Sequence, residues 1–169
     1  MHWRNILTLS AIAALGLTLQ SGNAIAQQKS LKEQLIGTWS FVSSNAKRAD
    51  GTPFWGENPK GLFIITDSGH FSWQVFRCDR PHLVSNNRLN GTADELNAIN
   101  QGTLAYFGTY SVDEAEKTIT FRTVASTYPN SEGELIKRVI TKLSPDEMIY
   151  SNPANTLGER VEARWKRLR

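Results

Sequence analysis

The sequence predicts an all-β domain built as an eight-stranded antiparallel up-and-down barrel with one or two short helices. The triplet Gly37-Thr38-Trp39 follows a short amphipathic stretch, a position typical of the first strand of a small closed barrel. The rest of the chain alternates short strands with turn residues at fairly regular spacing, which favours hairpin connections. Eight strands leave room inside for one small ligand. A β-sandwich is the second candidate, because the number of strands alone does not decide between the two folds.

A single helical turn is expected before the first strand. Ser30 and Glu33 have the spacing of a capping box, and Leu31 and Leu35 share one face of the turn, which we expect to close one barrel end. The apolar run 62–65 suggests a strand buried on both faces. The expected strands are Thr38–Lys47, Gly61–Thr66, His70–Arg77, Thr103–Val112, Thr118–Ser126, Leu135–Leu143, Met148–Ser151 and Val161–Leu168.

A long connection separates the third and fourth expected strands. It runs from Cys78 to Gly91, and a second capping box, Thr92 to Glu95, then opens a short helix that ends near Gln101. Insertions of this length in compact domains are often lids or binding loops. A plain surface excursion is the other interpretation, and the sequence leaves both open.

The first residues have the pattern of a secretory signal peptide. Arg4 gives a basic start, the run 6–19 is mostly apolar, and Ala24-Ile25-Ala26 is a small-x-small cleavage site. The apolar run is shorter than the roughly 20 residues needed to span a bilayer. We therefore expect a signal peptide over residues 1–26, a barrel domain over residues 27–169, and a periplasmic or secreted protein with no membrane span after cleavage.

The composition restricts the partners and the chemistry. The formal net charge of +3 is mild, and no basic stripe interleaves with aromatic residues, so nucleic acid is not expected as a partner. Cys78 is the only cysteine, which rules out an intramolecular disulfide and leaves either an inert thiol or pairing between chains. His70 and His82 are the only histidines after residue 26, and they lack metal-ligand spacing, so no metal or cofactor is indicated. The oligomeric state is not predicted.

Four stretches, in order along the domain, carry a family resemblance. They are Leu35-Ile36-Gly37-Thr38-Trp39; Asn58-Pro59-Lys60-Gly61 with Ser68-Gly69 and Arg77-x-Asp79-Arg80-Pro81; Ala105-Tyr106-Phe107-Gly108-Thr109-Tyr110; and Ser126, Pro129-Asn130 and Gly133 with Arg164-Trp165-Lys166-Arg167. Together they resemble the bacterial lipocalin-like domain family, a calycin-type β-barrel. The resemblance implies a barrel, and small-molecule binding follows from that fold only by association.

The resemblance also implies one structural contact and shows one departure. In lipocalin-like barrels the opening tryptophan commonly rests against a basic residue near the C-terminus, which here would place Arg164 or Arg167 on Trp39. Many members carry His and Glu on the fifth strand, where this chain has Arg122 and Val124. Any chemistry performed by that pair would be absent from this protein.

Alternation along the strands selects the candidate pocket residues. In the third strand, hydrophobicity favours the face of Phe71, Trp73 and Arg77 inward; the opposite face would offer Ser72 and Gln74. Arg77 would lie at the barrel mouth and meet an anionic group, or would pair with Asp79 in a turn, which is the favoured alternative. In the eighth strand we expect Val161, Ala163 and Trp165 inward, with Trp165 near Trp39.

The fourth strand carries a second set of candidates on one face. Tyr106 and Tyr110 flank Gly108 there, and either orient a ligand with their hydroxyl groups or fill the core. Gly108 either opens space or permits a close backbone approach.

The function that these features favour is non-catalytic binding of a small, largely apolar or amphipathic molecule inside the barrel. The expected ligand-binding residues are Phe71, Trp73, Arg77, Tyr106, Tyr110 and Phe121. An alternative is an enzyme, an isomerase, cyclase or hydrolase, that uses Tyr110, His70 or Arg122 as acid or electrophile in the same pocket. A third possibility is an interaction protein whose barrel is filled by its own side chains.

Overall fold

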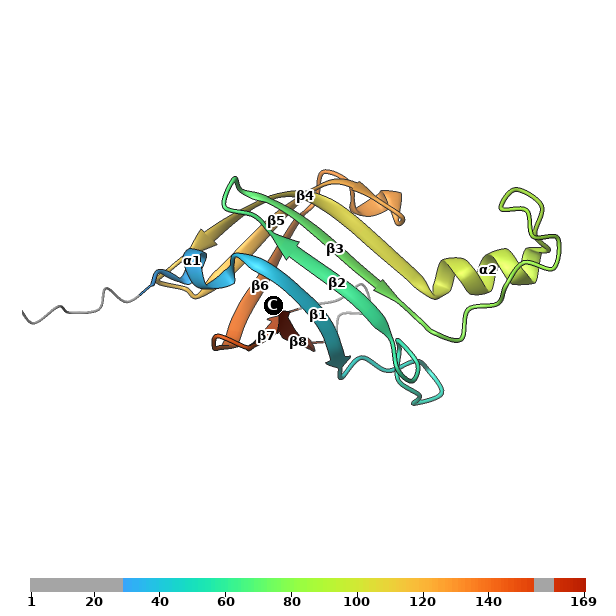
Figure 1. The fold of residues 1–169 in the computed structure, drawn as a ribbon, viewed down its shortest axis with the longest axis horizontal. Helices are drawn as coiled ribbons and strands as arrows, with labels where there is room; N and C mark the ends of the chain where they lie inside the picture. The colour runs from blue at the N-terminus through green and yellow to red at the C-terminus, as the bar shows by residue number, and fades with distance from the viewer. Residues whose placement is uncertain (1–28, 154–159) are drawn as a thin grey trace, which may run out of the picture.

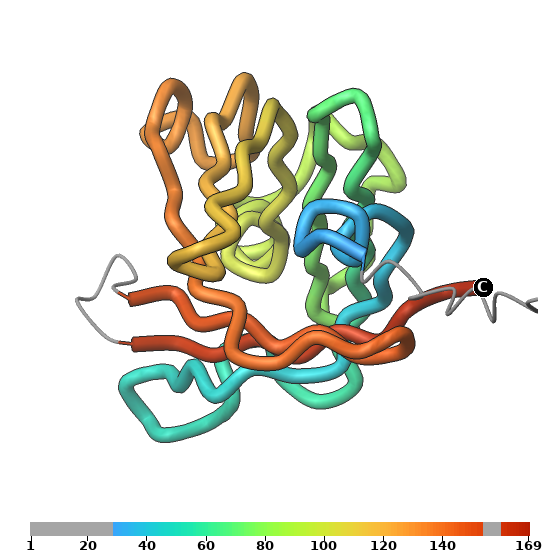
Figure 2. The backbone as a smooth tube through the Cα atoms, turned by 90° about the vertical axis from the view of Figure 1, so that its left-hand side faces the viewer, coloured from blue at the N-terminus to red at the C-terminus, as the bar shows by residue number. Residues whose placement is uncertain are grey.

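The structure is a computed structural model that describes residues 29–153 and 160–169, so the expected signal peptide lies outside the described residues. Its eight strands form one closed barrel in sequence order, and every neighbouring pair is antiparallel, including β1 with β8 (Figure 2). The predicted up-and-down barrel is therefore confirmed. The elements are α1 (Leu31–Leu35), β1 (Gly37–Ser44), β2 (Lys60–Ile65), β3 (His70–Phe76), α2 (Ala93–Gln101), β4 (Thr103–Asp113), β5 (Thr118–Ser126), η1 (Pro129–Ser131), β6 (Leu135–Leu143), β7 (Glu147–Asn152) and β8 (Val161–Leu168).

The two ends of the barrel have different connections. At one end, called the closed end here, α1 lies beside three short turns, residues 66–69, 114–117 and 144–146. At the other, the open end, the connections 45–59, 77–102 and 127–134 are longer (Figure 1). Consecutive antiparallel strands place alternate connections at opposite ends, so the three short turns gather at one end and the three longer connections at the other.

Trp39 anchors α1 to the closed end. The side chain is fully buried, and its indole Nε1 donates a hydrogen bond of 3.0 Å to the carbonyl oxygen of Leu35. The guanidinium carbon of Arg167 lies 3.9 Å from the centre of the Trp39 ring. The expected contact between this tryptophan and a basic C-terminal residue is confirmed, with Arg167 in that role.

Arg167 also explains the glycine before Trp39. Gly37 has φ of +139°, and a Cβ there would lie 2.4 Å from Nη1 of Arg167. The β1–β8 register sets Trp39 opposite Arg167 and Phe41 opposite Trp165. Trp165 packs across the closure against Phe41, with ring centres 5.0 Å apart. Trp39 lies two positions from Phe41 on the same strand and belongs to the same buried cluster as Trp165.

The burial pattern of β3 confirms which of its faces is internal. Phe71, Trp73 and Val75 are buried, whereas the alternate residues are half-buried or exposed. In β2 the expectation of burial on both faces is only partly met, because Phe63 is buried and Leu62 is half-buried.

Gly108 permits a close approach between strands. The register of β4 and β5 shifts between Phe107 and Gly108, and a Cβ on Gly108 would lie 1.9 Å from the carbonyl oxygen of Arg122. Of the two explanations offered by the sequence, the close approach is the correct one.

The connection 77–102 leaves the barrel beside the open end and carries α2 outward (Figure 1). The predicted capping box is present, because the Thr92 hydroxyl accepts from the backbone N–H of Glu95 while the Glu95 carboxylate accepts from that of Thr92. No residue of α2 is buried. Among the described residues, no helix is both long enough and apolar enough to cross a membrane.

Candidate functional site

A cavity of ≈ 680 Å³ occupies the open half of the barrel. The closed half is filled by buried side chains, among them Phe63, Phe121, Met148 and Trp165. None of the cavity-lining residues belongs to 77–102, which favours the surface excursion over the lid for that connection. The apolar and aromatic lining consists of Phe54, Trp55, Trp73, Leu104, Tyr106, Tyr128, Ile136, Tyr150, Val161 and Ala163, together with Ala46, Leu135 and Pro153.

Three aromatic side chains form the inner wall of the cavity. Trp73 and Tyr106 are directly opposite each other in the β3–β4 register, and their rings stack with centres 5.0 Å apart. The Trp73 indole Nε1 donates a hydrogen bond of 2.9 Å to the hydroxyl oxygen of Tyr150. The bond gives the buried indole N–H an acceptor and fixes the orientation of both rings.

Arg138 is the charged residue on the internal face of β6. It lies opposite Ile119 in the β5–β6 register, and its neighbours on the same face are Ile136 and Ile140. Its guanidinium carbon is 5.8 Å from the centre of the Tyr150 ring. One guanidinium nitrogen, Nη1, donates 3.0 Å to the Oδ1 atom of Asn152.

The phenols beside Arg138 are held in their neutral form. Burial raises the pKa of Tyr106 and of Tyr150, and the Arg138 guanidinium opposes this rise in both cases. Because burial is the larger cause, both tyrosines act as neutral hydrogen-bonding groups near pH 7.

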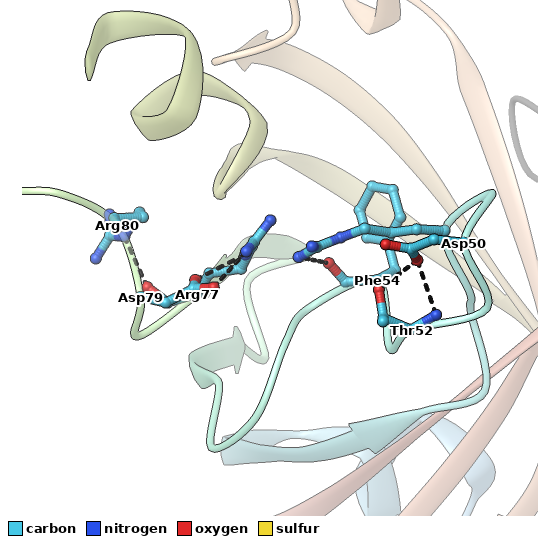
Figure 3. A network of polar contacts seen from close by, with 7 residues as sticks. Asp50, Thr52, Phe54, Arg77, Asp79 and Arg80 are labelled. Atoms are coloured by element: carbon cyan, nitrogen blue, oxygen red, sulfur yellow. Dashed lines mark hydrogen bonds and ion pairs between the residues drawn. The ribbon is translucent and has the colours of Figure 1, made fainter. Parts of the chain in front are cut away.

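The connection 45–59 supplies the outer part of the wall. Trp55 is 9% exposed, with its ring centre 6.1 Å from that of Trp73. Phe54 packs edge-on against Trp55, with ring centres 5.1 Å apart. The turn that carries them is held by Asp50, whose carboxylate accepts hydrogen bonds from the backbone N–H and the hydroxyl of Thr52 (Figure 3).

The structure brings only two of the six predicted ligand-binding residues to the cavity, Trp73 and Tyr106. Phe71 and Phe121 are buried in the core, with ring centres 4.5 Å apart, and do not line it. The Tyr110 hydroxyl donates 2.6 Å to the carbonyl oxygen of Thr66 at the closed end, also away from the cavity.

Arg77 likewise does not line the cavity. It forms a two-point ion pair with Asp79, in which Nε donates 2.8 Å to Oδ1 and Nη2 contacts Oδ2 (Figure 3). The turn contact is therefore the correct alternative for this residue. Arg77 borders a separate hollow of ≈ 350 Å³ at the exit of β3, together with the exposed Cys78.

The residues offered for an enzymatic role are not gathered at one place. His70 and Arg122 are exposed on the outer face of the barrel, whereas Tyr110 points to the inner face and uses its hydroxyl on Thr66. Within residues 29–153 and 160–169, no group of three or more His, Cys, Asp or Glu side chains is arranged to hold a metal ion.

Sequence reasoning missed three residues of the site: Arg138, Tyr150 and Trp55. Arg138 had a usable signal, because it occupies the apolar phase of the alternation between Ile136 and Ile140. Trp55 had none, since it lies in an irregular segment whose path depends on tertiary packing.

The family comparison agrees with the barrel. A family model described as a lipocalin-like domain matches residues 36–168. Among curated proteins, none is detectably similar to this chain.

Solved structures with similar folds have low sequence identity. A lipocalin-like protein from Bacteroides uniformis is 16% identical, with a TM-score of 0.42, and the match covers 80% of this chain and 99% of that protein. A redesigned β-barrel is 14% identical, with a TM-score of 0.45 and coverage of 84% and 98%. A de novo designed fluorescence-activating β-barrel is 12% identical, with a TM-score of 0.43 and coverage of 83% and 99%.

Proposed function

This chain belongs to the lipocalin-like domain family, and on that basis we propose that it binds one small, largely apolar molecule in the cavity at the open end of its barrel. The observation that carries the proposal is the contrast within the barrel interior. Side chains fill its closed half, whereas the open half keeps a cavity of ≈ 680 Å³. That volume lies in the range of about 300–1,000 Å³ that is usual for sites of small ligands.

The chemistry of the wall supports an apolar ligand body. Trp73, Tyr106 and Leu104 offer ring faces and a branched side chain, and burying a ligand against them contributes about 25 cal/mol per Å² before the costs of ordering. Because Trp73 is already bonded to Tyr150 and stacked on Tyr106, the wall is ordered before any ligand arrives. Pre-organisation of this kind lowers the cost of binding.

A neutral fluorescent probe, N-phenylnaphthylamine, tests the proposal directly. We expect the purified protein to bind it in a saturable way with enhanced emission. Ala163→Phe should abolish binding, since Ala163 lines the cavity and the added ring occupies its volume. Ala105→Phe is the matched control, because Ala105 precedes Tyr106 on β4 and does not line the cavity.

The outcomes separate the candidate functions. Binding that Ala163→Phe removes and Ala105→Phe retains supports the cavity as the site. No uptake of the probe by the wild-type protein would overturn the proposal in favour of a filled-barrel interaction protein. Native mass spectrometry of protein purified from its own host would then identify any molecule that co-purifies.

We also propose that the protein is exported to the periplasm or secreted, on the pattern of residues 1–26. The basic start, the apolar run and Ala24-Ile25-Ala26 support this. N-terminal sequencing of the protein recovered from the extracytoplasmic fraction should begin at Gln27. Recovery of the chain from the cytoplasm with Met1 intact would contradict it.

A further inference from the structure

Arg138 lies in an environment that is unusual for a charged side chain. Its side chain is half-buried and leaves β6 toward the barrel interior, between Ile136 and Ile140. A cation in such a place loses part of its hydration, and that loss is normally offset by a carboxylate or by a full set of hydrogen bonds.

Neither form of compensation is complete. None of the ion pairs among the described residues involves Arg138. Its hydrogen bonds to described residues all come from Nη1, which donates to Oδ1 of Asn152 at 3.0 Å and to the carbonyl oxygen of Lys137 at 3.2 Å. The edge of the guanidinium formed by Nε and Nη2 makes neither of these two bonds. The guanidinium also interacts weakly with the hydroxyl oxygens of Tyr106 and Tyr150, which are uncharged and do not neutralise it.

The groups around this free edge do not replace a counter-ion. The Tyr150 hydroxyl oxygen already accepts from the Trp73 indole, and Tyr106 is a neutral phenol. Among the described lining residues, Lys47, Lys137 and Arg138 stand against one carboxylate side chain, Glu134. Of these four side chains only Arg138 is half-buried, and the other three are exposed. The cavity thus has a cationic excess at its polar side and aromatic walls elsewhere.

We propose that the Nε–Nη2 edge of Arg138 is the head-group site of the cavity and that its ligand is an amphipathic carboxylate, a molecule with an apolar body and one ionised acid group. The inference rests on the proposed function and adds the charge and shape of the ligand to it.

A carboxylate fits the free edge in geometry as well as in charge. The two parallel N–H groups of a guanidinium edge match the two oxygens of a carboxylate, which allows a pair of charge-assisted hydrogen bonds. The bond from Nη1 to Asn152 holds the guanidinium plane in place. With the acid group there, the apolar body of the ligand lies against Trp73, Tyr106 and Leu104, all of which line the same cavity.

Competition between matched ligands tests this inference. Lauric acid and lauryl alcohol share the same chain length and differ in the head group. Each is titrated against bound N-phenylnaphthylamine at neutral pH, below its aggregation limit. We expect laurate to displace the probe from the wild-type protein at about a tenfold lower concentration or less, the effect of charge-assisted hydrogen bonds. Arg138→Gln should bring the two ligands to equal potency while retaining the probe.

Two further variants keep the test decisive. Lys166→Gln removes an exposed cation of β8 that does not line the cavity and should keep the preference for laurate. Arg138→Lys keeps the charge without the planar edge and should give an intermediate preference, which also covers the case in which Arg138→Gln fails to fold.

The failure of this inference is distinguishable from the failure of the proposed function. Equal potency of laurate and lauryl alcohol on the wild-type protein, with the probe bound, would overturn the carboxylate site and leave the apolar cavity intact. Retention of the laurate preference in Arg138→Gln would also overturn it. Absence of probe binding would overturn both proposals.

Discussion

The two ends of the barrel use an arginine beside an aromatic ring in opposite ways. At the closed end every guanidinium nitrogen of Arg167 donates to a backbone carbonyl: Nε to Pro145 at 2.6 Å, Nη1 to Ile36 at 2.7 Å and Nη2 to Gln34 at 2.6 Å. At the open end, the two hydrogen bonds that Arg138 donates to described backbone and amide oxygens both come from Nη1. An arginine whose donors are all satisfied by the backbone stabilises the fold, whereas one with a free edge in an apolar cavity is available to a ligand.

The same contrast holds for the tryptophans that accompany them. Trp39 is fully buried and bonded to α1, while Trp55 lies in the connection 45–59 and contributes its ring to the cavity wall. The closed end therefore carries the stability of the barrel, and the open end carries the proposed binding site.

Trp39→Ala should give the largest loss of stability. It removes a fully buried ring, its hydrogen bond to Leu35 and its contact with Arg167, so we expect the free energy of unfolding to fall by about 3–5 kcal/mol. Phe54→Ala, which truncates a ring 38% exposed at the open end, should cost about 1 kcal/mol or less. Urea unfolding measures both, and similar losses in the two variants would contradict the division between the ends.

Arg167→Lys should have the next largest effect. A lysine keeps the charge but cannot reach three carbonyl groups at once, so we expect a loss of about 2 kcal/mol in the free energy of unfolding. Arg164→Lys is the control, since Arg164 makes an exposed ion pair with Glu147 and should change stability by about 0.5 kcal/mol or less. Equal losses of stability for the two variants in thermal unfolding would show that position 167 needs a positive charge and not the planar hydrogen-bonding geometry of arginine.

The closed end was also the more predictable end from the sequence. Strand alternation and turn residues predict the barrel and its internal faces, because the burial of Phe71 and Trp165 follows directly from the period of two. The family resemblance added the contact between Trp39 and a C-terminal basic residue. These features depend on local sequence and on pairing between consecutive strands.

The cavity was less predictable because its depth is not a property of any single strand. Tyr110 and Tyr106 share a face of β4, yet one ends at Thr66 near α1 and the other at the cavity wall. Which of them meets a ligand depends on how far core side chains fill the barrel from the closed end. Similarly, Arg77 lies at the end of a strand near the mouth of the barrel. Its ion pair with Asp79 depends on the path of the turn that follows, which the strand pattern does not specify.

Arg138→Met should have a smaller effect, of the opposite sign. In the absence of ligand the half-buried charge has no carboxylate partner, and an apolar side chain of similar length removes the desolvation cost. We expect the free energy of unfolding of the empty protein to stay unchanged or to rise by about 1 kcal/mol. A loss of more than about 1 kcal/mol in urea unfolding would instead make Arg138 a structural residue like Arg167.

Tyr106→Phe should have the smallest effect near neutral pH, and its effect should grow only in alkali. Burial raises the pKa of Tyr106 above the value near 10 that it has in the unfolded chain. The neutral phenol is therefore favoured by folding, so the contribution of this group is fully present below pH 10 and is lost as the pH rises toward the folded-state pKa.

Stability measured against pH separates this contribution from others. The wild-type free energy of unfolding should fall more steeply than that of Tyr106→Phe once the pH passes about 10, while the two curves run parallel below it. Parallel curves throughout would mean that the Tyr106 hydroxyl is open to water in the folded protein. That result would place solvent at the inner wall of the cavity and weaken the argument that Arg138, beside the same hydroxyl, lacks compensation for its lost hydration.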